Sequence, residues 1–235
     1  MKTSFHNAAW RLDPAEIVTS MQSPLPGFHV PAYVRQFYTA LKTQQEDMGR
    51  SVGGAFMHGG AIPDIANGRR PKDIDIYVCI PQLTDALKKA YVKPDETDPL
   101  SLFGRTDRVE MAMGNSFPLI ILEDLPRPQN NPLFGDYFEM EGYFHRADGS
   151  HHVYDLRVGS QPLEMQKFLS WVHAPVMAVA ASLEEDGGFA YHKDMPDHHA
   201  RGIMRIAGTA PDVLKRKAQR KGMTIEEAPL PPPPQ

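Results

Sequence analysis

The chain has 235 residues, of which 41% are hydrophobic and 23% are charged, and its formal net charge is -4. This composition is ordinary for a globular protein, so it excludes intrinsic disorder of the whole chain, and the length suffices for one large domain. The single cysteine, Cys79, excludes an internal disulfide, and no apolar run reaches the ~20 residues of a membrane span. Because the amino terminus also lacks the apolar segment of a signal peptide, we expect a cytoplasmic protein that does not enter membranes.

Proline is overrepresented, with 22 residues, about 9% of the chain against a usual ~5%. Five prolines lie in the last seven residues, so we predict a disordered proline-rich tail over residues 226–235. Pro24 and Pro26 interrupt the amino-terminal segment, and residues 1–30 are therefore expected to form an irregular extension. No linker or repeat divides the rest of the chain, which predicts one domain over residues 31–225.

The first half of this domain is predicted to combine helices with one strand. The spacing of apolar residues predicts a helix that begins near Pro31, and a second helix follows the break at His58-Gly59-Gly60. Asn67-Gly68 is expected to end that second helix. The predicted elements after the break are a helix over Ala61–Ala66, a strand over Asp73–Ile80 and a helix over Gln82–Val92.

The second half is predicted to be rich in strands, which makes the fold class mixed α/β. Residues 93–108 show no clear period and are expected to form a loop. The Asp-Gly pair within residues 146–150 predicts a hairpin turn. The predicted elements are strands over Val109–Met113, Pro118–Leu122, Tyr137–Phe144 and His151–Val158, and helices over Pro162–Trp171 and Asp212–Lys221.

Two carboxylates on the predicted strand over Asp73–Ile80 carry the main chemical signal. Asp73 and Asp75 are two residues apart, so both side chains leave the same face of the strand, whereas Ile74 and Ile76 face the core. Two neighbouring carboxylates on an apolar strand repel each other unless a cation lies between them. Mg²⁺ prefers oxygen ligands, and this pair therefore predicts a magnesium site.

Gly59 and Gly60 are the second signal, because they directly precede the predicted helix over Ala61–Ala66. Backbone N–H groups at the start of a helix can bind phosphate, and glycine lets the phosphate approach the backbone without a clash at Cβ. Either signal alone is common in proteins. Together they predict a site that binds both a phosphate group and a divalent cation.

The order of these features resembles the head domain of the tRNA nucleotidyltransferase and poly(A) polymerase family, within the DNA polymerase β-like nucleotidyltransferase superfamily. The match consists of Gly-Gly, a short helix, Gly68 and then Lys72-Asp73-Ile74-Asp75 on a strand, and it is close over residues 58–78 only. The resemblance implies a polymerase β-like fold with a mostly antiparallel sheet flanked by helices. It also implies transfer of a nucleoside monophosphate from an NTP, such as ATP, to a hydroxyl acceptor, the 3′ end of a tRNA-like RNA.

The family further implies that three carboxylates hold two metal ions, with the third carboxylate on a later strand. Our choice is Asp155, a lone acid within the apolar, β-rich run over His151–Val158. In that role Asp155 would bind metal and accept the proton of the attacking hydroxyl. Glu139 and Glu141 on the preceding strand are the competing choices, and a salt bridge with Arg157 is the structural alternative for Asp155.

Basic residues beside the aspartates are the predicted contacts of the triphosphate. Lys72 directly precedes Asp73 and would reach the phosphates from the start of the strand, or would simply be solvated. Arg69 and Arg70 lie in the connecting loop and could steer a nucleotide or an RNA backbone, although for at least one of them a solvated role is the stronger interpretation.

The chain departs from the family pattern at several places. Pro63 replaces the arginine that precedes Asp64 in the family, which removes one donor and one positive charge near the expected triphosphate. The wide separation between Asp75 and Asp155 suggests an insertion over about residues 93–135. No counterpart of the family's tRNA-recognising helical body follows, so addition of CCA to tRNA is not inferred.

Two alternatives follow from these departures. The same chemistry could modify a protein or a small molecule, as in toxin-like members of the superfamily. Alternatively, the chain could be a nucleotide-binding interaction protein that has lost catalysis.

Two further clusters are weaker signals. The basic stretch over Lys215–Lys221 could bind nucleic acid or could be a solvated helix face. The histidines of segment 192–199 could bind zinc, although a polar loop is the stronger interpretation.

Overall fold

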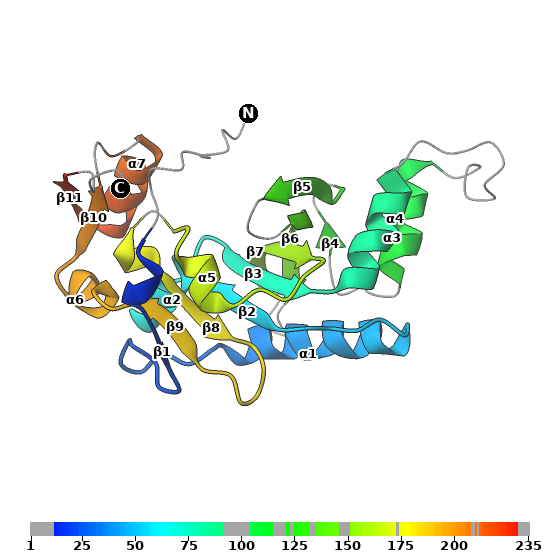
Figure 1. The fold of residues 1–235 in the computed structure, drawn as a ribbon, viewed down its shortest axis with the longest axis horizontal. Helices are drawn as coiled ribbons and strands as arrows, with labels where there is room; N and C mark the ends of the chain where they lie inside the picture. The colour runs from blue at the N-terminus through cyan, green and yellow to red at the C-terminus, as the bar shows by residue number, and fades with distance from the viewer. Residues whose placement is uncertain are drawn as a thin grey trace. The chain divides into compact units, whose positions relative to one another are not determined.

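A computed structural model describes residues 12–91, 104–114, 121–122, 125–131, 135–145, 151–172, 174–207, 210 and 212–229 (Figure 1). The chain divides into two compact units. We call the described parts of residues 29–163 and 181–187 the sheet unit, and those of residues 1–28, 164–180 and 188–235 the terminal unit. The single domain predicted over residues 31–225 thus contains parts of both units, and its boundaries stay a prediction.

The sheet unit is built around a mostly antiparallel sheet. Its strands lie in the order β2 (Ala55–His58), β3 (Ile74–Cys79), β7 (His151–Gly159) and β6 (Gly135–His145). Two short strands, β4 (Ile121–Leu122) and β5 (Arg127–Asn131), both pair with β6. The pair β3–β7 is parallel, whereas β2–β3 and β6–β7 are antiparallel. The predicted mixed α/β fold class, with a mostly antiparallel sheet and flanking helices, is confirmed.

One face of this sheet is apolar and covered by helices. On β3, Ile74, Ile76 and Val78 are at most 1% exposed, and Tyr154, Leu156 and Val158 on β7 are fully buried. Helix α1 (Ala32–Asp47) packs on this face, with the rings of Phe37 and Tyr154 5.3 Å apart between centroids. Because side chains alternate along a strand, Asp75 and Asp155 must lie on the opposite face.

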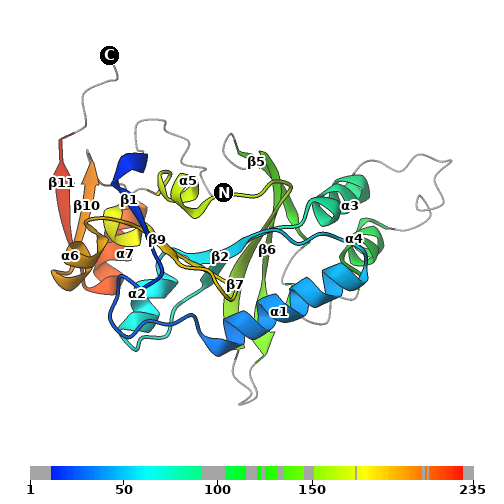
Figure 2. The same ribbon diagram turned by 60° about the horizontal axis from the view of Figure 1, so that its bottom comes forward.

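Helix α3 (Pro81–Tyr91) covers the same apolar face at β6, where the Tyr91 ring lies 5.7 Å from that of Phe138. Helix α4 (Arg105–Met113) packs against α3, and Figures 1 and 2 both draw the two side by side. Across the described residues, none of the helices combines the length and the apolar character needed to cross a membrane.

Local signals explain where the elements near the acids begin and end. Helix α1 starts directly after Pro31, and β3 and α3 lie within one residue of their predicted bounds. Helix α2 covers Ala61–Ala66 as predicted, with Pro63 in its first turn, where the missing N–H costs little. Asn67 caps this helix, and Gly68 follows with a φ of 66° that favours glycine.

The strand predicted over Val109–Met113 is wrong. This segment is the second half of α4. Val109, Ala112 and Met113 are its buried residues, at helical rather than alternating spacing. The run was too short to distinguish the two periods from sequence, and its continuation into residues 105–108 was predicted as loop. The helix begins after Gly104 and ends at Gly114, whose φ is 60°.

Of two other predicted elements, one is described only in part and one is shorter than expected. Of the strand predicted over Pro118–Leu122, the described part is β4, and the helix predicted over Pro162–Trp171 is reduced to α5 (Met165–Leu169). The strands over Tyr137–Phe144 and His151–Val158 are confirmed as β6 and β7. The Asp-Gly turn predicted within residues 146–150 lies outside the described residues, but β6 and β7 pair as a hairpin requires.

The terminal unit contains short elements from distant parts of the chain. Its antiparallel pair is β1 (Ile17–Ser20) with β9 (Phe189–His192), and its parallel pair is β10 (Ile203–Ala207) with β11 (Thr224–Ala228). Helix α7 (Asp212–Lys221), which has the predicted bounds, connects β10 to β11. The remaining elements are a 3₁₀ turn (Pro14–Glu16), α5, a 3₁₀ turn (Pro175–Met177), the first residues of β8 (Val179–Ser182) and α6 (Met195–Ala200).

Strands β1 and β11 correct the predictions for the two ends of the chain. The segment 1–30, expected to be irregular, contains β1, and β11 continues into the stretch 226–235 that was predicted as a disordered tail. Each strand is stabilised by a partner that local sequence patterns do not reveal, β9 for β1 and β10 for β11. Residues 230–235, which hold most of the terminal prolines, lie outside the described residues.

Gly159 at the end of β7 leaves room for the buried side chain of Tyr77 on the neighbouring strand β3. A methyl group at Gly159 would overlap the hydroxyl of Tyr77, which is fully buried and donates a 2.6 Å hydrogen bond to the carbonyl oxygen of Gln161. We predict that Gly159→Ala lowers the free energy of unfolding by about 2 kcal/mol, measured by urea denaturation. Gly54→Ala is the control because no heavy atom lies within 4 Å of its added Cβ; equal losses in both variants would contradict this packing.

Candidate functional site

The polar face of the sheet carries a row of three acidic side chains and one histidine. In the strand register, His58 on β2 lies opposite Asp75 on β3, Asp75 opposite Asp155 on β7, and Asp155 opposite Glu141 on β6. Residues directly opposite each other on neighbouring strands point to the same face, and the strands lie about 4.8 Å apart. We call His58, Asp75, Asp155 and Glu141 the acidic row.

The parallel pairing of β3 and β7 brings together two of the three predicted metal ligands. Asp75 and Asp155 are direct register partners although 80 positions separate them in the chain. Asp73 lies two residues before Asp75, directly before β3, and is half-buried.

The competing glutamates have different surroundings. Glu141 belongs to the acidic row but forms an ion pair with Arg127 at 2.8 Å. Glu139 lies opposite Arg157 and pairs with its Nε at 3.3 Å. Of the three candidates for the third carboxylate, Asp155 is the one on β7, the strand that pairs with β3. Its assignment stays a prediction.

The environment of Asp155 favours its protonated form. Burial, followed by the charge of Asp75, raises the pKa of Asp155 from 3.8 to about 6. Asp73 and Glu141 add to this increase, whereas Arg157 opposes it. An acidic row of this kind gains stability from a cation beside it.

Arg157 is the cation of the protein that contacts the centre of the acidic row. Its Nη1 lies 3.5 Å from Asp75 Oδ1 and donates toward His58 Nε2 at 3.0 Å, while its Nε pairs with Glu139. Burial lowers the pKa of Arg157, but Asp75 and Glu139 outweigh this effect, so that the pKa is raised overall. The salt bridge considered for Asp155 is thus formed by Asp75 and Glu139 instead.

His58 and the linking role of Arg157 were missed by sequence reasoning. His58 was seen as part of a chain break, but it is the last residue of β2 and is 6% exposed. The alternation of Asp155 and Arg157 on one face was visible in the sequence. Their partners depend on the register of β2, β3 and β6, which no local pattern contains.

The turn formed by Gly59 and Gly60 lies against the acidic row. Gly59 has a φ of 76°, and a Cβ added there would lie 3.4 Å from Asp75 Oδ2. Gly60 is the cap residue before α2, and both glycines are buried. The backbone at Gly59 therefore lies close to Asp75, and the approach of a phosphate to these two glycines stays a prediction.

The predicted triphosphate contacts Lys72 and Arg70 are exposed. Lys72 Nζ pairs with Asp73 Oδ2 at 3.3 Å, and its side chain is 70% exposed. Arg70 lies in the exposed connection between α2 and β3. Phosphate binding by either residue stays a prediction.

The carboxylate oxygens on the polar face of the sheet are suitable ligands for magnesium, but the described residues do not form a closed metal site. Asp73, Asp75 and Asp155 supply the carboxylate oxygens that Mg²⁺ prefers. Within the described ranges, no group of three His, Cys, Asp or Glu side chains is already arranged to hold a metal ion. Asp75 Oδ1 already contacts Arg157, so a metal ion bound by Asp75 would share this carboxylate with the guanidinium or displace it.

The zinc site considered for segment 192–199 is likewise not formed among these residues. His192 is buried at the end of β9, and its Nε2 lies 3.0 Å from Glu16 Oε2. The expected polar loop is wrong in part, because α6 contains His198 and His199.

The chain matches no family model and no curated protein. Among solved structures, it is similar to a Thermotoga maritima CCA-adding enzyme complexed with tRNA, with 16% identity and a TM-score of 0.43 over 90% of this chain and 43% of that one. It is also similar to CCA-adding enzymes in complex with ATP (17% identity, TM-score 0.44, 89% and 43% covered) and with CTP (16%, 0.44, 90% and 44%). The chain spans less than half of their length, and a similarity of this extent does not establish its activity or substrates.

Asp155 makes stability depend on pH. Because the folded chain binds this proton more tightly than the unfolded chain, with a pKa of about 6 against 3.8, the wild type loses stability as the pH rises through 6. We predict that Asp155→Asn raises the free energy of unfolding by about 1 kcal/mol at pH 8, after allowance for partial solvent screening, and leaves it nearly unchanged at pH 4.

Urea denaturation at both pH values, without and with Mg²⁺, measures this effect. Added Mg²⁺ is expected to stabilise the wild type at pH 8 more than Asp155→Asn. The same pH dependence in both proteins would contradict the assignment of the shifted pKa to Asp155.

Proposed function

We propose that this protein is a magnesium-dependent nucleotidyltransferase, which transfers a nucleoside monophosphate from an NTP to a hydroxyl acceptor, the 3′ end of an RNA. The observation that carries this proposal is the direct pairing of Asp75 with Asp155 on adjacent parallel strands. It joins the Lys-Asp-Ile-Asp strand to a distant acid on one face, as the family resemblance requires. A cytoplasmic location stays part of the proposal and rests on the single cysteine.

Asp73, Asp75 and Asp155 are the proposed ligands of two Mg²⁺ ions. When bound, the ions would lower the pKa of the attacking hydroxyl and neutralise the charge of the leaving pyrophosphate. Asp155 would accept the hydroxyl proton, in keeping with an environment that raises its pKa. The hydroxyl oxygen then forms a bond to the α-phosphorus, the bond to the pyrophosphate oxygen breaks, and pyrophosphate leaves.

Gly59, Gly60, Lys72 and Arg70 are the proposed triphosphate contacts. The bare backbone at Gly59 lies close to Asp75, so a phosphate could reach the backbone and the acids at once. Lys72 pairs with Asp73 in an exposed position, where ion pairs contribute little, and it could exchange that partner for a phosphate at small cost. Pro63 takes the place of the family's arginine in the first turn of α2. The loss of this positive charge is expected to alter which NTP the protein prefers.

A second candidate is a nucleotide-binding protein without catalysis. The contact of Arg157 with Asp75 favours it, because this pair supplies a counter-charge where the metal would bind. This candidate predicts NTP binding that does not depend on Mg²⁺, whereas the proposed enzyme turns NTP over only when Mg²⁺ is present.

Removal of either central carboxylate tests the enzyme directly. We predict that Asp75→Asn and Asp155→Asn each lower incorporation of α-labelled NTP into total RNA by about two to three orders of magnitude, because metal ligands supply several kcal/mol to the transition state. Asp85→Asn on α3 is the matched control, since this carboxylate is 66% exposed. Undiminished incorporation by both site variants would refute the proposed chemistry.

The acceptor is tested separately. We expect α-labelled NTP, offered with total RNA and with cell lysate from which RNA has been digested, to label RNA alone. Label on a protein or a small molecule, with none on RNA, would instead establish the same chemistry on a different acceptor, as in the toxin-like alternative. Electrophoresis before and after ribonuclease or protease treatment distinguishes these products.

A further inference from the structure

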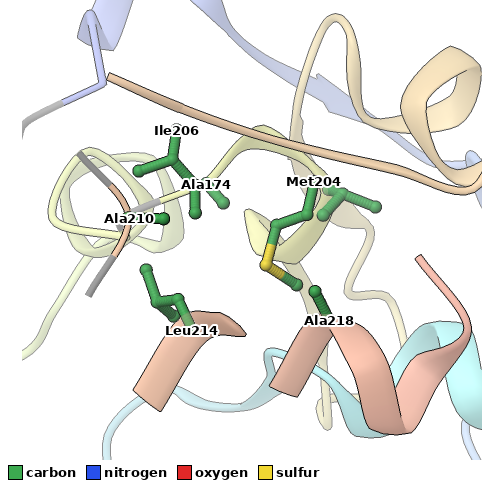
Figure 3. Close-up of a cluster of buried hydrophobic side chains, with 7 residues drawn as sticks. Ala174, Met204, Ile206, Ala210, Leu214 and Ala218 are labelled. Carbon is green, nitrogen blue, oxygen red and sulfur yellow. The ribbon is translucent and has the colours of Figure 1, made fainter. Parts of the chain in front are cut away.

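Helix α7 of the terminal unit buries one face and exposes a basic one. Leu214 and Ala218 belong to a buried cluster with Met204 and Ile206 of β10, and Figure 3 shows both side chains directed from α7 toward this cluster. Ala210 completes the contact, and its N–H donates to Glu227 on β11 at 2.9 Å. The rotation of α7 about its axis is fixed by this packing.

The opposite face of α7 carries cations. Lys215, Arg216 and Arg220 are exposed, and i, i+4 spacing places Arg216 beside Arg220 on the helix surface. Within the part of the chain that the structure describes, none of these three residues forms an ion pair, although Asp212 lies one turn earlier. The two acids of β11 have other partners: Glu227 accepts the hydrogen bond from the Ala210 N–H, and Glu226 lies 4.0 Å from Arg201.

This arrangement is costly for a helix that has no partner. Like charges at i, i+4 are destabilising, and the helix dipole favours cations only in the last turn. That preference accounts for Arg220 but not for Lys215 and Arg216 in the first half of α7. The cations are also clustered in a chain whose net charge is -4.

We infer that the exposed face of α7, formed by Lys215, Arg216 and Arg220, binds the phosphate backbone of a single-stranded RNA. A polyanion relieves the repulsion between these side chains and gains affinity from counterion release. The inference rests on the proposed function for the choice of RNA, and it adds a place on the chain where the acceptor is held.

The buried face of α7 favours RNA over an anionic membrane. A helix that lies on a membrane inserts an apolar face among the lipids. In α7 that face is occupied by the core cluster of Leu214 and Ala218, which leaves Val213 as a single exposed apolar residue.

Binding of a fluorescent oligouridine of about 20 nucleotides to the full chain, followed by anisotropy over about 50–200 mM salt, tests the inference. Lys215→Gln/Arg220→Gln is expected to lower the affinity at the lowest salt by about tenfold and to reduce the slope of log K against log[salt] by about 1.4, because each lost phosphate contact contributes ~0.7. Lys215→Arg/Arg220→Lys, which retains the charges, is expected to bind as the wild type does.

Lys193→Gln/Arg201→Gln is the matched control, since it removes one lysine and one arginine that already pair with Glu16 and Asp197 in the same unit. It is expected to keep the wild-type slope. Equal losses in the test and control variants, or binding to anionic vesicles with none to RNA, would overturn the inference. Asp75→Asn is expected to bind the oligouridine normally, so failure of catalysis and failure of this surface are distinguishable.

Discussion

The parallel pairing of β3 with β7 is the constraint on which the candidate site depends. It places Asp75 beside Asp155, and the same alternation places Ile76 beside Leu156 on the buried face. The repulsion between two carboxylates is therefore offset by apolar burial on the reverse side of the same two strands. A weaker sheet would relieve the repulsion by separating the strands. Here the helices α1 and α3 cover the apolar face, so the acids stay close and the pKa of Asp155 rises.

Arg157 sets the charge balance of this face. It contacts His58, Asp75 and Glu139, which belong to three different strands, and it thereby ties β2, β3 and β6 to β7. Removing one partner of a buried charge pair is more costly than the pair is worth, because the remaining charge is left without compensation. The same guanidinium therefore stabilises the sheet and limits how much positive charge the acidic row can still attract. This dual role links the fold directly to the affinity expected for metal ions.

Sequence alone predicted the parts of this structure whose signals are local. The bounds of α2 and α7 agree with the prediction, because Gly60, Asn67 and the spacing of apolar residues act within a few positions. The candidate site was predicted as a set of acids but not as an arrangement. His58 and the contacts of Arg157 depend on strand register, and register is decided by pairing between segments far apart in the chain. For the same reason β1 was missed, since its partner β9 lies near the other end of the chain.

The long connection between β3 and β7 has a consequence for how sequences of this kind can vary. This connection contains α3, α4 and strands β4 to β6, and closing a longer flexible loop costs only about 0.6 kcal/mol for each doubling of its length, so insertions outside those helices and strands cost little. A shift of β7 by one residue would instead set Tyr154 or Leu156 beside Asp75 and turn Asp155 toward the core. Length changes outside the helices and strands of this connection are thus nearly neutral, whereas a single deletion inside β3 or β7 removes the site while most of the chain remains intact.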